Sequence, residues 1–470
     1  MSRLLRALPS ALVTLLAVNS ALSQSTLTPL ATFGTNGWVA PGASAFVTTG
    51  NTERGLAYNP ITGNLVLVSR AGGTNLRVLD GQTGADLGAL NSTGITGGTF
   101  VVSQGEVADD GAIYVCNLST SIGAAFKVYK WDNEALGLVT PPSVAYTGTP
   151  GVTRLGDCFA VYGGSAVPAQ FAAAGSNNVS ASNFAVGSLD GLNTATPYLS
   201  VPGTTTTSND YRLALSWIDQ NTLLGNQGAN VRVTSLAGAT ATVSATIPVG
   251  AAQRPMDYAV IGGTPVLAII DTNSSIVRIY DITVPTAPTL LVAATTTTGT
   301  LTANANGTGA VQWGAISGNS ATLYAMSSNQ GIQAFQVTID LPASAQPFGI
   351  GCGTPALALS AVGAPILPST IQLQADNLPV TTAAGFFLFG FVSIPGGAPI
   401  PIAPGCSQYV LPLSTSFFFP LGAPSYQSPL SFPNDPFFAG LEVFVQAGAF
   451  DGVSSGVTAT NGLRLYLKTF

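Results

Sequence analysis

The sequence contains no histidine, and only 7% of its 470 residues are charged, against roughly 25% in an average soluble protein. The missing histidine excludes Ser-His-Asp and Cys-His hydrolases, HExxH metalloproteases and most zinc, copper and iron sites. The scarcity of charge excludes a helical bundle, whose exposed faces would be rich in Glu, Lys and Arg. Because the net charge is -6 and no basic run exists, we expect no nucleic-acid partner.

The N-terminus has the pattern of a secretory signal peptide. Arg3 and Arg6 give a basic start, residues 12–18 are apolar, and Ala21-Leu22-Ser23 resembles a cleavage site. This pattern predicts a signal peptide over residues 1–23. No later run resembles a membrane-spanning helix, so we expect a secreted or cell-surface protein with no transmembrane segment after cleavage.

Cysteine is also scarce, with Cys116, Cys158, Cys352 and Cys406 as the complete set. Four cysteines fit an exported protein in an oxidising compartment, and three pairings are possible. Two cysteines fall in each of the two domains predicted below, which favours the pairs Cys116–Cys158 and Cys352–Cys406. The lack of a CxxC spacing argues against a metal or redox motif.

Glycine and small residues are abundant, and they conceal a repeat of about fifty residues. Six segments align when one alanine is held in register, with spacings of 51, 52, 54, 45 and 56 residues. The aligned alanines are Ala57, Ala108, Ala160, Ala214, Ala259 and Ala315. Each alanine segment is followed by a turn, a second apolar strand and a third strand that mostly alternates apolar and polar residues.

Three or four short strands per repeat, with no helical stretch between them, predict an all-β fold. The favoured architecture is a six-bladed β-propeller over residues 24–341, with a seven-bladed propeller as the numerical alternative. A solenoid or a sandwich is the architectural alternative. The segment TLTPLATFG, which precedes the first repeat, is expected to add a fourth strand to the last blade.

Particular repeat sequences resemble those of known propellers. VADDGAIYVCN resembles the Asp-x-x-Gly-x-Ile/Leu-Tyr-Val repeat of NHL and gluconolactonase-type propellers, with Ala108 in place of the first Asp. AYNPITGNLVLVS, followed by RVLDGQTG, resembles YVTN and quinoprotein-type repeats. Residues 30–340 therefore resemble an uncharacterised family of secreted bacterial propellers. This resemblance implies the fold rather than an activity.

A second domain is predicted from residue 342 to residue 470. Pro342, Pro347 and Pro355 interrupt the repeat, and the strands that follow are apolar, Phe-rich and separated by Pro-containing turns. This pattern predicts a small β-sandwich closed by one disulfide. Segments such as PNDPFFAGLEVFVQA resemble a C-terminal module appended to many secreted bacterial proteins. That resemblance implies sorting or surface attachment.

A recurrent charge precedes the aligned alanine in five of the six repeats. The positions two or three residues before each alanine hold Arg54, Glu106, Asp157, Arg212, Asp257 and Trp313. If this register lies near the start of each innermost strand, these side chains line one mouth of a central channel. The favoured interpretation is a network of charges that neutralise each other between adjacent blades, and a ligand-binding site is the alternative.

A calcium site is a further alternative, because Glu106, Asp157 and Asp257 are oxygen donors of the kind that Ca²⁺ prefers. Arg54 and Arg212 at matching positions disfavour a cation, so no cofactor is the primary expectation. We therefore expect a secreted, non-catalytic propeller that binds an extracellular or cell-surface macromolecule. A calcium-dependent hydrolase of the lactonase type is the alternative.

Overall fold

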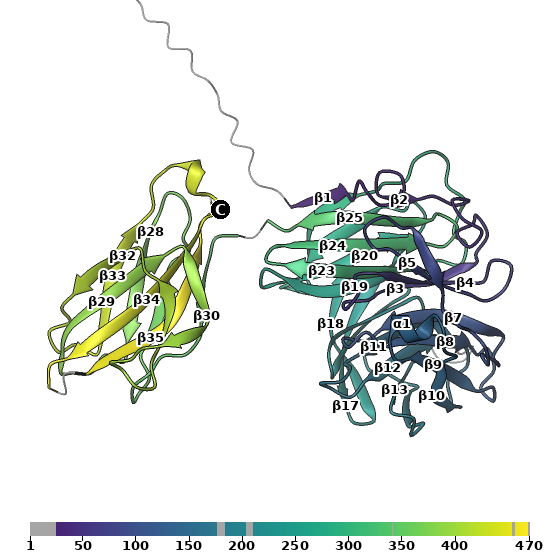
Figure 1. The fold of residues 1–470 in the computed structure, drawn as a ribbon, viewed down its shortest axis with the longest axis horizontal. Coiled ribbons are helices and arrows are strands. Elements are labelled where there is room, and N and C mark those ends of the chain that lie inside the picture. Colours follow the sequence, from purple (N-terminus) through teal and green to yellow (C-terminus); the bar gives the residue numbers. More distant parts are fainter. Residues whose placement is uncertain (1–24, 176–183, 204–209, 341, 454–455, 469–470) are drawn as a thin grey trace, which may run out of the picture. The chain divides into compact units, whose positions relative to one another are not determined.

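The computed structural model of the chain describes all residues except 1–24, 176–183, 204–209, 341, 454–455 and 469–470. The predicted signal peptide, residues 1–23, lies outside the described residues. The chain divides into two compact units, of which one is Gln24–Asp340 and the other contains Leu341–Phe470. Both units are built almost entirely from antiparallel β-strands (Figure 1). No helix in the described ranges is long and apolar enough to cross a membrane.

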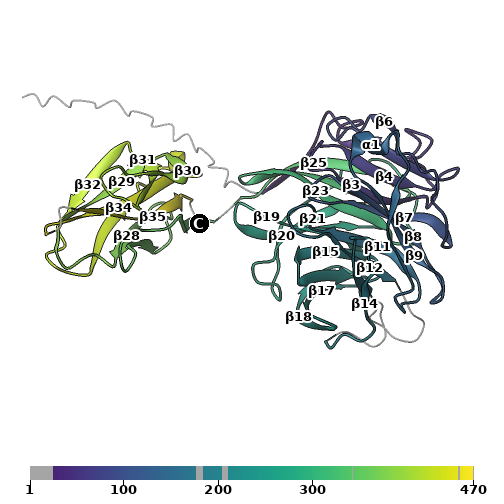
Figure 2. The same cartoon turned by 60° about the horizontal axis from the view of Figure 1, so that its bottom comes forward.

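In the described part of residues 24–340, five four-stranded sheets each consist of strands that follow one another along the chain (Figures 1 and 2). The sheets are β3 (Glu53–Tyr58), β4 (Leu65–Ser69), β5 (Asn75–Leu79) and β6 (Asp86–Ala89); β7 (Phe100–Val107), β8 (Ile113–Leu118), β9 (Phe126–Trp131) and β10 (Ser143–Gly148); β11 (Leu155–Tyr162), β12 (Gln170–Gly175), β13 (Phe184–Ser188) and β14 (Ala195–Tyr198); β15 (Ala214–Asp219), β16 (Thr222–Asn226), β17 (Asn230–Ala237) and β18 (Thr240–Pro248); and β19 (Gln253–Ile261), β20 (Thr264–Asp271), β21 (Val277–Asp281) and β22 (Thr289–Ala294). A short helix, α1 (Glu134–Gly137), follows β9.

A sixth sheet combines the two ends of this unit. It contains β23 (Gly309–Ser317), β24 (Ser320–Ser327) and β25 (Ile332–Thr338). The N-terminal strand β1 (Thr26–Pro29) pairs antiparallel with β25, and β2 (Trp38–Val39) pairs with β25 farther along. The strand predicted in TLTPLATFG therefore joins the last sheet.

The first strands of the six sheets contact one another in sequence order. Strand β3 contacts β7, β7 contacts β11, and the series continues through β15, β19 and β23, which contacts β3. Hydrophobic clusters lie between successive sheets; one contains Leu56 and Tyr324, and the next contains Val66 and Val115. All five residues of β4 are buried, as expected for an apolar, β-branched strand covered on both faces.

Residues 342–470 form a second all-β unit. A five-stranded sheet contains β26 (Ser344–Phe348), β35 (Val457–Tyr466), β34 (Glu442–Asp451), β29 (Thr382–Gly390) and β32 (Ser414–Phe418). A three-stranded sheet contains β27 (Ala358–Val362), β28 (Thr370–Asp376) and β33 (Ser425–Ser431), and β30 (Val392–Pro399) pairs with β31 (Ser407–Leu411). The 3-10 turn η1 (Pro436–Phe438) precedes β34. The two larger sheets share one hydrophobic cluster, which includes Leu373 and Val445.

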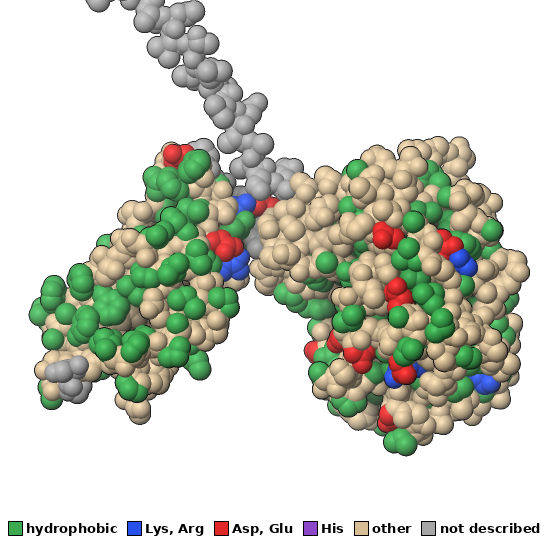
Figure 3. Space-filling model, viewed as in Figure 1, with side chains coloured by type: hydrophobic (Ala, Val, Ile, Leu, Met, Phe, Trp, Pro, Cys, Tyr) green, Lys and Arg blue, Asp and Glu red, His purple; other side chains and the backbone are tan. Residues whose placement is uncertain are grey.

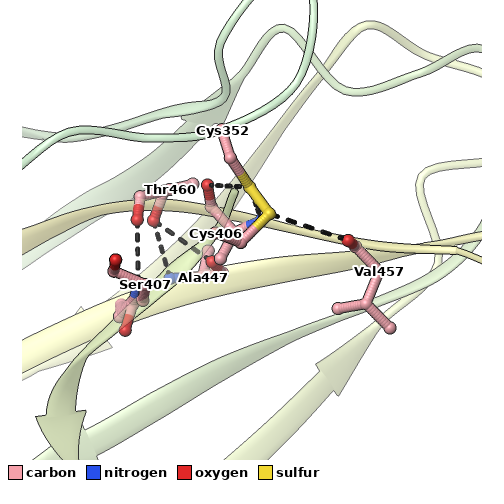
Figure 4. Close-up of a disulfide and its surroundings, with 8 residues drawn as sticks. Cys352, Cys406, Ser407, Ala447, Val457 and Thr460 are labelled. Carbon is pink, nitrogen blue, oxygen red and sulfur yellow. Dashed lines mark hydrogen bonds between the residues drawn. A yellow bond between two sulfur atoms is a disulfide. The ribbon is translucent and has the colours of Figure 1, made fainter. Parts of the chain in front are cut away.

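The predicted disulfide Cys352–Cys406 is confirmed, and it closes a sequence separation of 54 residues (Figure 4). Cys352 precedes β27 and Cys406 immediately precedes β31, so the bridge links the segment that begins this unit to the middle of its chain. Figure 4 shows the bridge next to Val457 and Thr460 of β35. Such a cross-link restricts the unfolded chain and thereby stabilises the folded unit.

The other predicted disulfide is wrong, because Cys116 and Cys158 are free and buried. Cys116 packs with Phe159 in the cluster between the β7–β10 and β11–β14 sheets. Cys158 belongs to the cluster on the other side of β11, and its thiol donates a hydrogen bond to the Tyr211 carbonyl at 3.1 Å. Successive side chains of a strand point to opposite faces, so Cys158 points away from the space that Cys116 occupies.

Candidate functional site

All six positions of the predicted ring lie on, or just before, the first strand of a sheet, but they divide into two groups. Arg54 and Asp157 are the second residue of β3 and the third of β11, and Arg212 lies just before β15. Glu106 is the seventh residue of β7, whereas Asp257 and Trp313 are fifth in β19 and β23. Arg54, Asp157 and Arg212 therefore form a strand-start group, and Glu106, Asp257 and Trp313 form a second group farther along the strands.

Asp157 is the centre of the strand-start group. Its side chain is 1% exposed, and its Oδ2 lies 2.5 Å from Nε of Arg154 and 2.8 Å from Nε of Arg212. A third guanidinium, that of Arg54, lies 3.9 Å from Oδ1. Arg54 also donates to Thr308 Oγ1 at 2.9 Å. The structure thus joins three of the predicted residues, Arg54, Asp157 and Arg212, in one ion-pair network between sheets.

Burial and ion pairing act on these groups in opposite directions. Burial by itself would raise the pKa of Asp157, but hydrogen bonds from Arg154 and Arg212 outweigh it, so the pKa is lowered. Burial, together with the neighbouring guanidinium of Arg70, lowers the pKa of Arg54 to about 10, although Asp157 opposes the change. At neutral pH these groups therefore keep their charges.

Glu106 is the first member of the second group. Its Oε1 accepts a hydrogen bond of 3.0 Å from the amide of Gln312, whose Oε1 accepts a long hydrogen bond of 3.5 Å from the Tyr58 backbone N–H. The carboxyl keeps some solvent contact, but protein atoms surround it closely. This desolvation raises the pKa of Glu106 well above its usual range, and the charge of Asp257 raises it further.

Asp257 shares this environment, and its hydrogen-bond donors in the described part of the chain are neutral groups. One of its carboxyl oxygens accepts hydrogen bonds of 2.9 Å from Ser216 Oγ and from the Tyr258 backbone N–H. The other accepts a hydrogen bond of 2.9 Å from the Trp313 backbone N–H. Desolvation raises the pKa of Asp257 to about 6, although these hydrogen bonds favour the charged form. Its ionisation therefore falls close to neutral pH.

A pocket of about 380 Å³ opens beside the two carboxyls. Its lining includes Glu106, Asp257 and Ser216 together with the aromatic residues Trp217 and Trp313. Tyr162, also in the lining, has its ring centroid 6.1 Å from that of Trp217. We call this site the carboxylate pocket; it combines hydrogen-bonding groups with aromatic surface, a combination typical of small-ligand sites.

The calcium alternative requires Glu106, Asp157 and Asp257 to act together, and the structure does not bring all three into one site. Asp157 is held by Arg154 and Arg212, whose charges oppose a cation at its oxygens. Outside the undescribed segments, no group of three His, Cys, Asp or Glu residues is placed to hold a metal ion. The conspicuous acids Asp109 and Asp110 are exposed in the turn between β7 and β8.

Sequence reasoning missed several contributors. Arg154 lies three residues before Asp157, and this short spacing in a chain with few charges was an available signal. Gln312 and Ser216 are neutral residues in strands that pattern analysis treats as structural. Their roles became visible only from their hydrogen bonds to Glu106 and Asp257.

No family model and no curated protein matches the chain. Among solved structures, a DUF4623 family protein from Bacteroides eggerthii DSM 20697 is similar to 62% of this chain and 72% of its own. The two share 16% sequence identity, with a TM-score of 0.46.

Proposed function

We propose that residues 24–340 form a closed six-bladed β-propeller. Three observations support this arrangement: the four-stranded sheets follow one another along the chain, their first strands contact one another from β3 through β23 and back to β3, and β1 completes the last sheet. In such a fold the first strands surround a central axis, where ligands commonly bind. Both groups of charged residues described above lie on, or next to, these strands.

The function that the geometry supports best is non-catalytic binding of a neutral sugar unit of an extracellular or cell-surface glycan. The carboxylate pocket carries this proposal, because it places two carboxyls, an amide and a hydroxyl beside tryptophan and tyrosine rings. Carboxylates accept hydrogen bonds from sugar hydroxyls, and aromatic rings pack against the apolar faces of a sugar. The pocket volume is in the lower part of the ~300–1,000 Å³ range of small-ligand sites.

Binding of neutral oligosaccharides, measured by glycan array and then by isothermal titration calorimetry, tests this proposal. The variant Asp257→Asn should weaken binding about tenfold or more, because a hydrogen bond to a charged group contributes roughly 1.5–3 kcal/mol. The matched control is Asp190→Asn, which changes an exposed aspartate in a turn after β13. Absence of glycan binding by the wild-type protein, or equal losses in both variants, would refute the proposal.

Hydrolysis is a second candidate, favoured by the raised pKa of Glu106 next to Asp257, as in enzymes that use a protonated carboxyl as a general acid. The calcium-dependent lactonase form has less support, because Asp157 is engaged by arginines. A lactone or glycoside turnover assay with wild type and Glu106→Gln tests the reaction. A thermal shift with millimolar Ca²⁺ tests the metal, and a shift that Glu106→Gln abolishes would favour the calcium alternative.

For residues 342–470 we propose a small β-sandwich that serves sorting or surface attachment of a secreted protein. The support is an apolar pocket of about 340 Å³, lined by residues such as Phe389, Phe391 and Leu413, near the end of this chain. Phe417, Phe419 and other large apolar side chains of this unit are exposed. Figure 3 shows hydrophobic side chains spread across its visible face. Contiguous exposed apolar surface is typical of interaction sites.

Removal of residues 342–470 tests the attachment proposal. The shortened protein should be released or mislocalised, while the unfolding transition of residues 24–340 stays unchanged, because the two units are separately compact. Fractionation of cells and medium measures the first effect, and tryptophan fluorescence measures the second. Unchanged localisation would contradict a sorting or attachment role.

A further inference from the structure

The strand-start group contains more positive charge than its carboxylate can neutralise. Five of the eight arginines of residues 24–340 belong to it or adjoin it. These are Arg54, Arg70, Arg154, Arg212 and Arg254, which we call the arginine cluster. Asp157 is the one carboxylate bonded to it within the described residues. The concentration is unexpected in a unit whose acidic residues outnumber its basic ones.

Two of these arginines reach the cluster without contacting Asp157. Arg70 directly follows β4 and places its guanidinium 3.8 Å from the ring centroid of Phe100, at the start of β7. Arg254, the second residue of β19, packs its guanidinium against Gly307, where even an added Cβ would meet Nη1 at 2.4 Å. Gly307 precedes Thr308, the residue that accepts the hydrogen bond from Arg54. Arg70 is an electrostatic neighbour of Arg54, and Arg254 is one of Arg212.

Nearby acids do not balance the charge. The buried Glu53 turns its Oε1 toward the backbone N–H of Thr48 and the hydroxyl of Thr52, at 2.8 and 2.9 Å. Asp271 lies within electrostatic range of Arg254, but Arg278 already pairs with it at 3.6 Å. Five arginines and one bonded aspartate therefore leave the cluster with net positive charge at this end of the first strands.

Several donors of the cluster have no acceptor. Arg54 is 3% exposed, yet its Nε has no hydrogen-bond partner in the described structure. Buried nitrogens of Arg70 and Arg254 also lack partners there, namely Nη1 and Nε, respectively. Buried N–H groups of native proteins are nearly always hydrogen-bonded, so these three guanidiniums retain donors that the acceptor oxygens of a ligand can use. Arg154 and Arg212, whose side chains are 34% and 27% exposed, leave an approach from solvent.

We propose that the arginine cluster binds a tetrahedral oxyanion of the phosphate or sulfate class. Such an anion offers several acceptor oxygens in different directions, which matches guanidiniums that converge from four different sheets. A carboxylate has two oxygens, and Asp157 already supplies that chemistry. The site is separate from the carboxylate pocket, whose acidic groups would repel the same ligand, so the two proposals can succeed or fail independently.

Isothermal titration calorimetry with inorganic phosphate and inorganic sulfate, at ionic strength held constant with NaCl, tests the proposal. The informative variants are Arg70→Gln and Arg254→Gln, because both leave every ion pair of Asp157 intact. Each should weaken anion binding about tenfold or more, since each removes charge-assisted donors. The matched control is Arg77→Gln, which removes a half-buried arginine paired with Asp86 and should bind the anions like wild type.

Glycerol phosphate in a parallel titration identifies the source of the anion. Tighter binding of the ester indicates a phosphate carried by a larger molecule, whereas tighter binding of inorganic phosphate indicates the free ion. A selenate-soaked crystal of the full chain does not depend on how the variants fold, and it should show anomalous selenium density within the arginine cluster. Selenate bound elsewhere, no wild-type binding of any of these anions, or an equal loss in Arg77→Gln would overturn the proposal.

Discussion

The arginine cluster and the carboxylate pocket lie on the same set of first strands, yet they place similar acids in opposite electrostatic situations. Asp157 and Asp257 are both aspartates on a first strand. Guanidiniums contact Asp157 and lower its pKa, whereas Asp257 receives hydrogen bonds from neutral groups and its pKa rises to about 6. Because desolvation acts on both, the difference lies in the charge of the donors.

Asp157 is a structural carboxylate, whereas Asp257 and Glu106 are available to a ligand. The oxygens of Asp157 are saturated by Arg154 and Arg212, so replacing that residue would disturb packing between sheets. Asp257 and Glu106 face a pocket and remain open to a ligand or a proton. Titratable groups with shifted pKa values concentrate at functional sites, but only the second arrangement leaves the carboxyl free to act.

The largest expected effect is that of Asp157→Asn on stability. Loss of this carboxylate leaves the neighbouring guanidiniums without a counter-charge, and breaking a buried ion pair in this way costs about 3–5 kcal/mol. Urea unfolding followed by tryptophan fluorescence measures the change, and all four tryptophans lie in residues 24–340. Asp86→Asn, at an exposed pair with Arg77, is the control and should cost less than about 1 kcal/mol. Equal losses would show that the ion pairs of Asp157 contribute no more to stability than an exposed ion pair does.

Asp257→Asn should change how the free energy of unfolding depends on pH, in the direction set by the raised pKa of Asp257. The folded pKa of Asp257 is about 6, above its ordinary value of 3.8. Its stabilising contribution is therefore complete below about pH 4 and is lost as the pH rises through 6. Wild type should lose about 2 kcal/mol relative to Asp257→Asn between pH 4 and pH 7. A constant difference between the two proteins across this range would contradict the shift.

Much of the strand order followed from the sequence, for a physical reason. Runs such as Leu65–Ser69 are apolar and β-branched, and alternation marks Asn75–Leu79 as a strand with one partly buried face, so local pattern and burial agree. The pairing of Thr26–Pro29 with the last sheet followed from the one segment left without a repeat. These features depend on local composition, which a single sequence contains.

The site was harder to predict, because a fixed alanine register ignores bulges. Pairing shifts occur between Glu53 and Gly55, and between Leu155 and Cys158, at the positions of Arg54 and Asp157. A shift of two or three residues moves a side chain along the strand. The single predicted ring consequently merged two levels, one around Asp157 and one around Asp257. The cysteine error has a related cause, since spacing does not reveal which face of β11 carries Cys158.

A smaller and asymmetric effect is expected within the carboxylate pocket. The charge of Asp257 raises the pKa of Glu106, so Asp257→Asn should lower the pKa of Glu106. The pKa of Asp257 is shifted by desolvation and by its own hydrogen-bond donors, so Glu106→Gln should change it little. Carbon NMR of protein labelled at its four Glu carboxyls measures the pKa of Glu106, and the signal that is missing from Glu106→Gln assigns that residue. Asp109→Asn, on the same pocket, is the control, and an equal change there would contradict direct coupling.

The smallest expected effect concerns the thiols between the two sites. Cys158 follows Asp157 and lines a cavity of about 30 Å³ together with Glu106 and Gln312. Burial raises the pKa of the Cys158 thiol, and it raises the pKa of the Cys116 thiol to about 12. The reactive thiolate is therefore scarce, and iodoacetamide should modify neither residue until urea unfolds the protein. Mass spectrometry should then find two modified cysteines. Reductant should leave the unfolding transition reported by the tryptophans unchanged, but it should destabilise residues 342–470 because it breaks the Cys352–Cys406 disulfide. A disulfide-linked Cys116–Cys158 peptide under non-reducing conditions would show instead that β8 and β11 are cross-linked. It would contradict the arrangement in which Cys158 points away from Cys116.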